Sequence, residues 1–136
     1  MNKIDHIGIA VRSIASTAGI YEKLLGVKSF KCEELPDEAL KVEFFEAGNG
    51  KIELLEATSS DSVIAKFIEK KGEGIHHIAF DVQDIYAEMK RLKAEGFTLL
   101  SDEAKPGADN KLICFVHPKD TSGVLIELCQ QMDFKA

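Results

Sequence analysis

Short apolar runs alternate with amphipathic stretches along this chain, and their order repeats once. Residues 4–11 and 75–82 are apolar runs rich in β-branched residues, each interrupted by histidine, and this composition predicts strands. Apolar residues at helical spacing follow each run. They predict one helix between the N-cap Ser13 and the stop residue Gly26, and a second helix that begins at Asp84.

Three further strands are predicted after each of these helices, so both halves have the same order of elements: a strand, a helix and three strands. A tight turn at Gly48-Asn49-Gly50 joins two strands of the first half, because glycine tolerates positive φ. Between the halves we expect a short helix capped by Asp61, and we expect the tail from Met132 to be frayed. The six additional strands are predicted at residues 27–33, 40–46, 51–56, 97–100, 111–117 and 123–130.

The repeat includes polar positions as well as apolar ones. His6 of the first half corresponds to His77 of the second, at a separation of 71 positions (77 − 6). Glu53 corresponds in the same way to Glu127, at a separation of 74 (127 − 53). The two separations are nearly equal, so the repeat relates the polar positions of the two halves as well as the apolar ones.

Each of these four residues lies in a strand whose neighbours are Ile, Leu or Val. An ionised carboxylate on an apolar face is costly unless it is paired or bound to a metal. A single strand histidine is usually a core or surface residue, and a single strand glutamate usually faces solvent. Four such residues at matched positions favour a shared site for a divalent cation such as Co, Ni, Mn, Fe or Zn.

Strand parity separates these candidates from their neighbours. His76 must point to the opposite face from His77, so we interpret His76 as structural, unless the register differs by one residue. Glu56 has the opposite parity to Glu53 and is expected to face solvent. Glu43 lies on the strand that forms a hairpin with that of Glu53, and from the pattern alone it is either solvent-facing or part of the site.

Composition and charge limit the class of protein. The chain has 136 residues, 45% of them hydrophobic, and a formal charge of −6, which argues against nucleic acid or an anionic membrane as partner. Three widely spaced cysteines without a C-x-x-C motif favour reduced thiols. No window approaches the ~20 apolar residues of a membrane span. We therefore expect a cytoplasmic protein.

With these residues identified, the sequence resembles the vicinal oxygen chelate superfamily, and within it the methylmalonyl-CoA epimerase family. The resemblance implies an α+β fold in which two βαβββ modules pair into a curved, incompletely closed mixed β-sheet barrel with helices outside. It implies a single domain over residues 1–136, with module one at about 1–57, a connector helix at about 58–73 and module two at about 74–131. The motifs that carry it are Asp5-His6-Ile7-Gly8-Ile9-Ala10-Val11, Tyr21-Glu22-Lys23-Leu24-Leu25-Gly26, Lys51-Ile52-Glu53-Leu54-Leu55-Glu56, the stretch 64–80 with Gly74-Ile75-His76-His77, and His117-Pro118-Lys119 through Gly123-Val124-Leu125-Ile126-Glu127-Leu128.

The same resemblance implies a reaction and its residues. The family interconverts (S)- and (R)-methylmalonyl-CoA by removing and returning the proton α to the thioester, through a metal-chelated enolate. Carried over by position, the metal ligands fall on His6, Glu53, His77 and Glu127, and the two acid–base carboxylates fall on Glu43 and Glu127. An acyl-CoA thioester is the implied substrate, and a homodimer is expected by analogy. The chain departs from the family in the loop 106–110, where relatives often have His-Gly after Pro-Gly-Ala.

Two alternatives remain open at this point. Glyoxalase I (lactoylglutathione lyase) shares the implied fold, the metal and a proton shift, but its substrate is a glutathione hemithioacetal. A non-catalytic binding module, as in the bleomycin-resistance proteins, also shares the fold but lacks the metal ligands. The connector that runs into Gly74-Ile75-His76-His77 and the C-terminal run that ends in Ile126-Glu127-Leu128 favour the epimerase over glyoxalase I. The presence of all four ligand residues argues against the binding module.

Overall fold

A computed structural model describes residues 1–132, which fall into two compact units. The N-terminal unit is His6–His76. The C-terminal unit combines Met1–Asp5 with the chain from His77 onward. The tail that was expected to fray lies, apart from Met132, outside the described residues. Strands β1 (Lys3–Ala10) and β5 (Gly74–Asp81) each contribute residues to both units.

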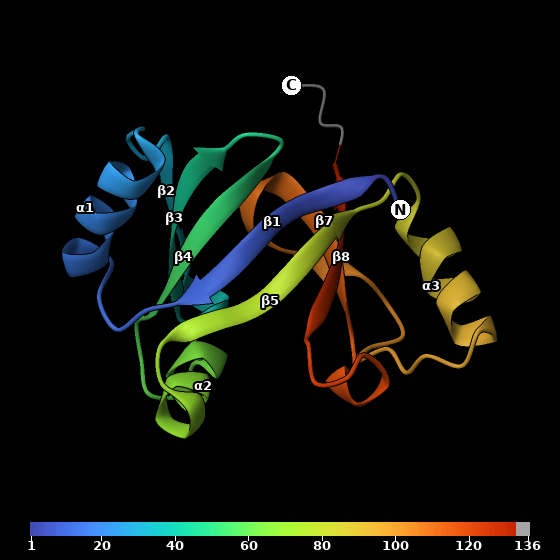
Figure 1. Cartoon of the computed structure of the whole chain (residues 1–136). Coiled ribbons are helices and arrows are strands. Elements are labelled where there is room, and N and C mark those ends of the chain that lie inside the picture. The colour runs from blue at the N-terminus through green and yellow to red at the C-terminus, as the bar shows by residue number, and fades with distance from the viewer. Residues whose placement is uncertain (133–136) are drawn as a thin grey trace. The chain divides into compact units, whose positions relative to one another are not determined.

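The N-terminal unit is a four-stranded mixed sheet in the order β2-β3-β4-β1 (Figure 1). β3 pairs antiparallel with β2 and β4, whereas β1 runs parallel to β4. The long chain segment between β1 and β4 provides the crossover that parallel strands need. Its remaining elements are α1 (Ile14–Leu25), β2 (Lys31–Leu35), the 3₁₀ turn η1 (Pro36–Glu38), β3 (Leu40–Ala47), β4 (Gly50–Ala57) and α2 (Val63–Lys71).

The C-terminal unit repeats this arrangement with its own strands, in the order β5-β8-β7-β6. β5 runs parallel to β8, and β7 pairs antiparallel with β8 and with the two-residue strand β6. Its other elements are α3 (Ile85–Ala94), β6 (Lys105–Pro106), the turn η2 (Ala108–Asn110), β7 (Lys111–Val116), the turn η3 (Pro118–Asp120) and β8 (Ile126–Gln131).

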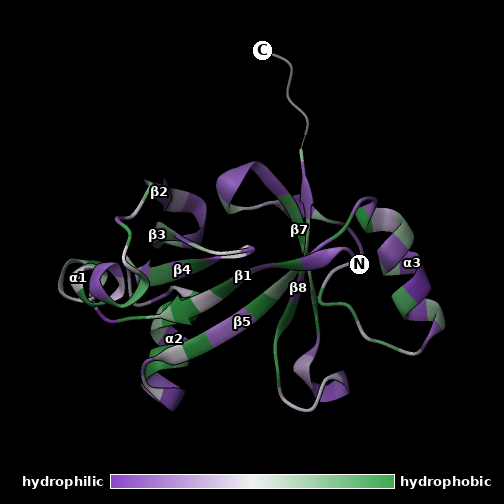
Figure 2. Ribbon diagram, turned by 45° about the horizontal axis from the view of Figure 1, so that its top comes forward, coloured by the Kyte–Doolittle hydropathy of each residue, from purple (hydrophilic) through white to green (hydrophobic). Residues whose placement is uncertain are grey.

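Each sheet packs an apolar face against the helix that follows its first strand. In the N-terminal unit, Phe45 and Leu54 are fully buried with Ile14 of α1. In the C-terminal unit, Leu128 is buried with Ile85 and Met89 of α3. Figure 2 shows hydrophobic and hydrophilic residues together on α3, the distribution expected of a helix with one buried face.

The helix ends follow the repeat closely. Ser13 and Asp84 accept hydrogen bonds from the first turns of α1 and α3, which confirms both predicted N-caps. In each unit, a side chain from a sheet strand, β4 or β8, also accepts a hydrogen bond from the first backbone N–H of the helix. The N–H of Ile14 donates to Glu56 Oε1 at 2.6 Å, and the N–H of Ile85 donates to Gln130 Oε1 at 2.7 Å.

Several predicted details differ from the structure. Glu56 is not solvent-facing, because it accepts the Ile14 amide described above. Ser62, not Asp61, caps α2 and accepts from the N–H of Ile64. Residues 97–100 form no named strand, and only Leu99 makes an isolated bridge to Val116. The strand predicted at 27–33 is displaced to β2, and that predicted at 123–130 is β8, which begins at Ile126.

None of the helices in the described part of the chain is both long enough and apolar enough to cross a bilayer.

Candidate functional site

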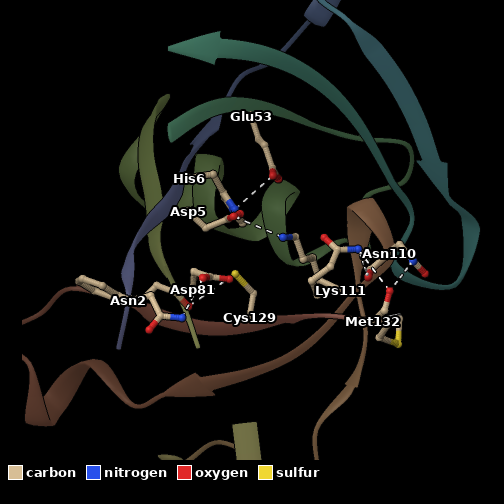
Figure 3. Close-up of polar contacts among 11 residues, drawn as sticks. Asn2, Asp5, His6, Glu53, Asp81, Asn110, Lys111, Cys129 and Met132 are labelled. Carbon is tan, nitrogen blue, oxygen red and sulfur yellow. Dashed lines mark hydrogen bonds and ion pairs between the residues drawn. The ribbon is translucent and has the colours of Figure 1, made fainter. Parts of the chain in front are cut away.

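The first predicted pair, His6 and Glu53, is assembled by the parallel strands β1 and β4. In their register Gly8 lies beside Glu53, so His6, two residues earlier, points to the same face. His6 Nδ1 lies 3.2 Å from Glu53 Oε2, and the two residues are only 4% and 3% exposed (Figure 3). The N-terminal unit thus holds one buried imidazole–carboxylate pair.

The second predicted pair, His77 and Glu127, is built in the same way by β5 and β8. Ala79 lies beside Glu127, which places His77 on the face of that carboxylate. His77 Nε2 lies 3.2 Å from Glu127 Oε1, and both residues are 5% exposed. The ring of Phe115, which is opposite Glu127 in the β7–β8 register, meets the His77 ring edge-on at 6.0 Å.

Both pairs fit the donor chemistry of a divalent metal. Two donor atoms bound to one ion at about 2.1 Å lie about 3.0–3.4 Å apart for bond angles of roughly 90–110°. The observed nitrogen–oxygen distances of 3.2 Å fall within this range. Within residues 1–132, no buried side-chain nitrogen or oxygen lacks a hydrogen-bond partner, so none of these four groups is orphaned.

His76, the neighbour of His77, occupies the opposite face of β5. Its ring packs edge-on against Phe67 of α2, with ring centroids 5.0 Å apart. Burial lowers the pKa of His76 to about 4, and the nearby positive charge of Lys71 contributes in the same direction. His76 is therefore neutral at physiological pH and packs as an aromatic residue.

Glu43 is not brought together with Glu53. In the β3–β4 register, Glu43 lies opposite Leu54, whereas Phe44 lies opposite Glu53. Residues directly opposite one another share a face, so Glu43 points to the face that packs against α1. There it accepts a hydrogen bond from the hydroxyl of Ser29. The assignment of Glu43 as a base stays a prediction that this register does not favour.

Two features of the site region were not found from the sequence. Phe44 and Phe115 occupy equivalent positions opposite the two glutamates, and this match follows only from the strand registers. A buried ion pair joins Lys111 Nζ and Asp5 Oδ1 at 3.4 Å, between residues 106 positions apart in the chain (Figure 3). Proximity in the sequence could not have indicated it.

The cysteines are free thiols and do not form a disulfide, as predicted. Cys32 is exposed, whereas Cys114 and Cys129 are buried. Burial is the main factor that raises the pKa of the Cys129 thiol, and the negative charges of Asp5 and Glu127 raise it further. A buried thiol of raised pKa is a poor nucleophile, so covalent catalysis by Cys129 is not indicated.

Comparison with known proteins shows which family the chain belongs to. The model of the Glyoxalase/Bleomycin resistance protein/Dioxygenase superfamily matches residues 5–115. The chain belongs to this superfamily. The ethylmalonyl-CoA/methylmalonyl-CoA epimerase of Cereibacter sphaeroides is 41% identical over 132 residues, which cover 96% of this chain and 98% of the relative.

Solved structures agree with the sequence relatives. A crystal structure of methylmalonyl-CoA epimerase from Mycobacterium tuberculosis has a TM-score of 0.91 and 34% identity, covering 96% of this chain and 89% of that chain. A single-residue variant of Streptomyces coelicolor methylmalonyl-CoA epimerase, in complex with 2-nitronate-propionyl-CoA, has a TM-score of 0.90 and 34% identity, covering 98% of this chain and 99% of that chain. The expected α+β fold is thus confirmed, and the chain is an enzyme of the isomerase class, with support for epimerase activity.

Proposed function

We propose that this protein interconverts the epimers of methylmalonyl-CoA, with a divalent metal held jointly by His6, Glu53, His77 and Glu127. The observation that carries the proposal is the pair of buried imidazole–carboxylate couples at matched positions of the repeat. The similarity to epimerases over nearly the whole chain supports the substrate class, an acyl-CoA thioester.

The proposed reaction needs a group that moves a proton at the carbon α to the thioester. The C–H bond breaks, the proton passes to a carboxylate oxygen, and its electron pair delocalises into the carbonyl to give an enolate. Return of a proton to the opposite face of that carbon completes the inversion. The metal, when bound, supplies Lewis-acid stabilisation of the negative charge that develops on oxygen.

Glu127 is the base that we assign to this chain. Its carboxylate is buried next to His77, on the face of β8 that carries the proposed metal ligands. Glu127 would serve as both metal ligand and base, and the positive charge of the cation would lower the basicity of its carboxylate. The resemblance places a second proton-transfer group on Glu43, but the β3–β4 register turns that side chain to the face opposite Glu53. The Glu43→Gln substitution decides between the resemblance and the register.

Two assays test the function against its closest alternative. Purified protein is assayed for conversion of (S)- to (R)-methylmalonyl-CoA and, separately, for formation of S-lactoylglutathione from a glutathione hemithioacetal. We expect activity in the first assay with a divalent metal present. Activity in the second assay alone would identify a glyoxalase I, and metal-independent binding without turnover in either would identify a binding module.

The metal site is tested with a matched pair of neighbouring histidines. His77→Ala removes a proposed ligand, so bound metal and epimerase activity should both fall at least a hundredfold. His76→Ala alters the other face of the same strand and should retain metal stoichiometry. Metal analysis of both variants checks this, and equal metal retention by the two would contradict the proposed ligand set.

Two expectations from the sequence belong to the same proposal. We propose a cytoplasmic location, which the three free thiols support, because such thiols persist in a reducing compartment. We also propose a homodimer, by analogy with paired-module proteins of this size. Size-exclusion chromatography with light scattering measures the mass in solution, and a monomeric mass would reject the dimer.

A further inference from the structure

A buried ion pair includes Asp5, the residue that directly precedes the proposed ligand His6 in the chain. Asp5 is 3% exposed and Lys111 is 6% exposed, and Lys111 Nζ lies 3.4 Å from Asp5 Oδ1. Asp5 precedes His6 in β1, and Lys111 is the first residue of β7. Figure 3 shows the ammonium group of Lys111 directed at the Asp5 carboxylate.

Stability alone does not account for this pair. Removing two charges from water carries a large desolvation cost, and replacing a buried ion pair with apolar residues of similar volume is often neutral or stabilising. By contrast, the charged pair Arg91–Glu88 on α3 lies at the surface, where Arg91 is half exposed. A pair retained in the interior therefore suggests that it fixes a geometry.

The position of Asp5 indicates which geometry is fixed. The division between the two units falls at the peptide bond that joins Asp5 to His6. The ion pair ties the residue before His6 to β7, and β7 also carries Phe115, the aromatic neighbour of His77 and Glu127. Through Asp5, the backbone that leads into His6 is thus tied to β7.

We propose that Asp5 and Lys111 form a positioning pair that orients His6 for metal binding. The inference rests on the proposed function, because His6 must be a metal ligand for its orientation to matter there. Neither residue needs to touch the substrate or the metal. Their effect is transmitted through the peptide bond between Asp5 and His6, as groups outside the ligand set commonly tune metal sites.

The main test compares variants of this pair with Co²⁺ as the probe. Asp5→Asn combined with Lys111→Met removes both charges and leaves no buried charge unpaired. We expect this double variant to melt close to the wild type but to bind Co²⁺ 10- to 100-fold more weakly. Lys111→Arg keeps the charge and should stay within about threefold of the wild type. Arg91→Met, which breaks the exposed pair on α3, is the matched control and should bind normally.

A second readout does not require the metal. The chain has four histidines, His6, His76, His77 and His117, so their imidazole NMR signals can be assigned by substitution. In the metal-free double variant the His6 signal should shift, whereas that of His117, in the surface turn η3, should not. If the double variant does not fold, the single Asp5→Asn variant is measured in the same way.

The outcomes separate this inference from the proposed function. Wild-type protein that binds no Co²⁺, or a His6→Ala variant that binds it normally, rejects the metal site. The His6 signal of the metal-free protein then decides the positioning role by itself. Unchanged Co²⁺ affinity together with an unmoved His6 signal in the double variant overturns the positioning role, even if the melting temperature falls.

Discussion

The two units place matching side chains at matching points of their sheets, yet the pairs they form differ in detail. In the N-terminal unit His6 presents Nδ1 to Glu53, whereas in the C-terminal unit His77 presents Nε2 to Glu127. Strand pairing fixes where each Cβ lies, but the rotamer of the imidazole depends on its neighbours. The repeat therefore specifies the set of donor residues, while the local packing selects the donor atom.

The units differ more strongly on the faces that pack against the helices. Glu43 and Cys114 occupy equivalent positions. Each directly precedes the phenylalanine, Phe44 or Phe115, that lies opposite the glutamate of its unit. Cys114 is buried in the core beneath α3, whereas Glu43 is half-buried and bonded to Ser29. A charged residue thus replaces a core residue at one of two equivalent positions, and it does so on the face away from Glu53.

The largest expected difference between the units concerns their two glutamates. Glu127→Gln should lower epimerase turnover by about 10³-fold, because it removes a proposed proton-transfer group as well as a charged ligand. Glu53→Gln should lower it less than about tenfold, since the amide keeps an oxygen donor for the metal.

Turnover and α-deuterium uptake in deuterated buffer are measured for both glutamine variants at saturating metal, together with metal content. If Glu53→Gln and Glu127→Gln lose activity equally, the two glutamates serve as ligands in the same way and the proposed base must be sought elsewhere.

An intermediate effect is expected at the ends of the helices. Glu56→Ala leaves the Ile14 amide without its side-chain acceptor and should lower the free energy of unfolding by about 1–2 kcal/mol. Glu56→Gln copies the residue that performs this task in the other unit, Gln130, and should cost less than about 1 kcal/mol. Urea denaturation of both variants checks this order.

Glutamine and glutamate can both accept the Ile14 amide. The wild type and the Glu56→Gln variant should therefore differ in stability only by the favourable interaction of a negative charge with the helix N-terminus, which glutamine lacks. A Glu56→Gln variant as unstable as Glu56→Ala would therefore show that charge, not hydrogen bonding, links β4 to α1.

Local sequence rules predicted much of this fold, because its strands and caps are local. Ser13, Gly26 and Asp84 end or begin helices as expected, and alternation along β5 correctly separated the faces of His76 and His77. The same parity rule failed for Glu56. Parity places it opposite to Glu53, but the face it points to is covered by α1 and is not solvent.

The rest depends on pairing between distant segments. The Asp5–Lys111 pair joins residues 106 positions apart in the chain, so no periodicity or motif could indicate it. The face of Glu43 depends on the register of β3 against β4, and a shift of one residue would exchange its face with that of Phe44. Sequence resemblance alone does not fix which face of a strand a residue occupies, whereas the strand pairing does.

The smallest effect on turnover is expected at Glu43, and it is the most direct test of that register. Glu43→Gln retains a hydrogen-bond acceptor for Ser29, and because the side chain points away from the face of Glu53, turnover should fall less than about threefold. The assay is the same deuterium uptake, with Glu127→Gln as the reference for a lost base. A hundredfold loss with metal content unchanged would mean that Glu43 does reach the substrate, and therefore that β3 does not hold this side chain on the α1 face when substrate binds. In that case the two units would differ in the mobility of one strand, since Cys114 at the equivalent position is fixed in the core beneath α3.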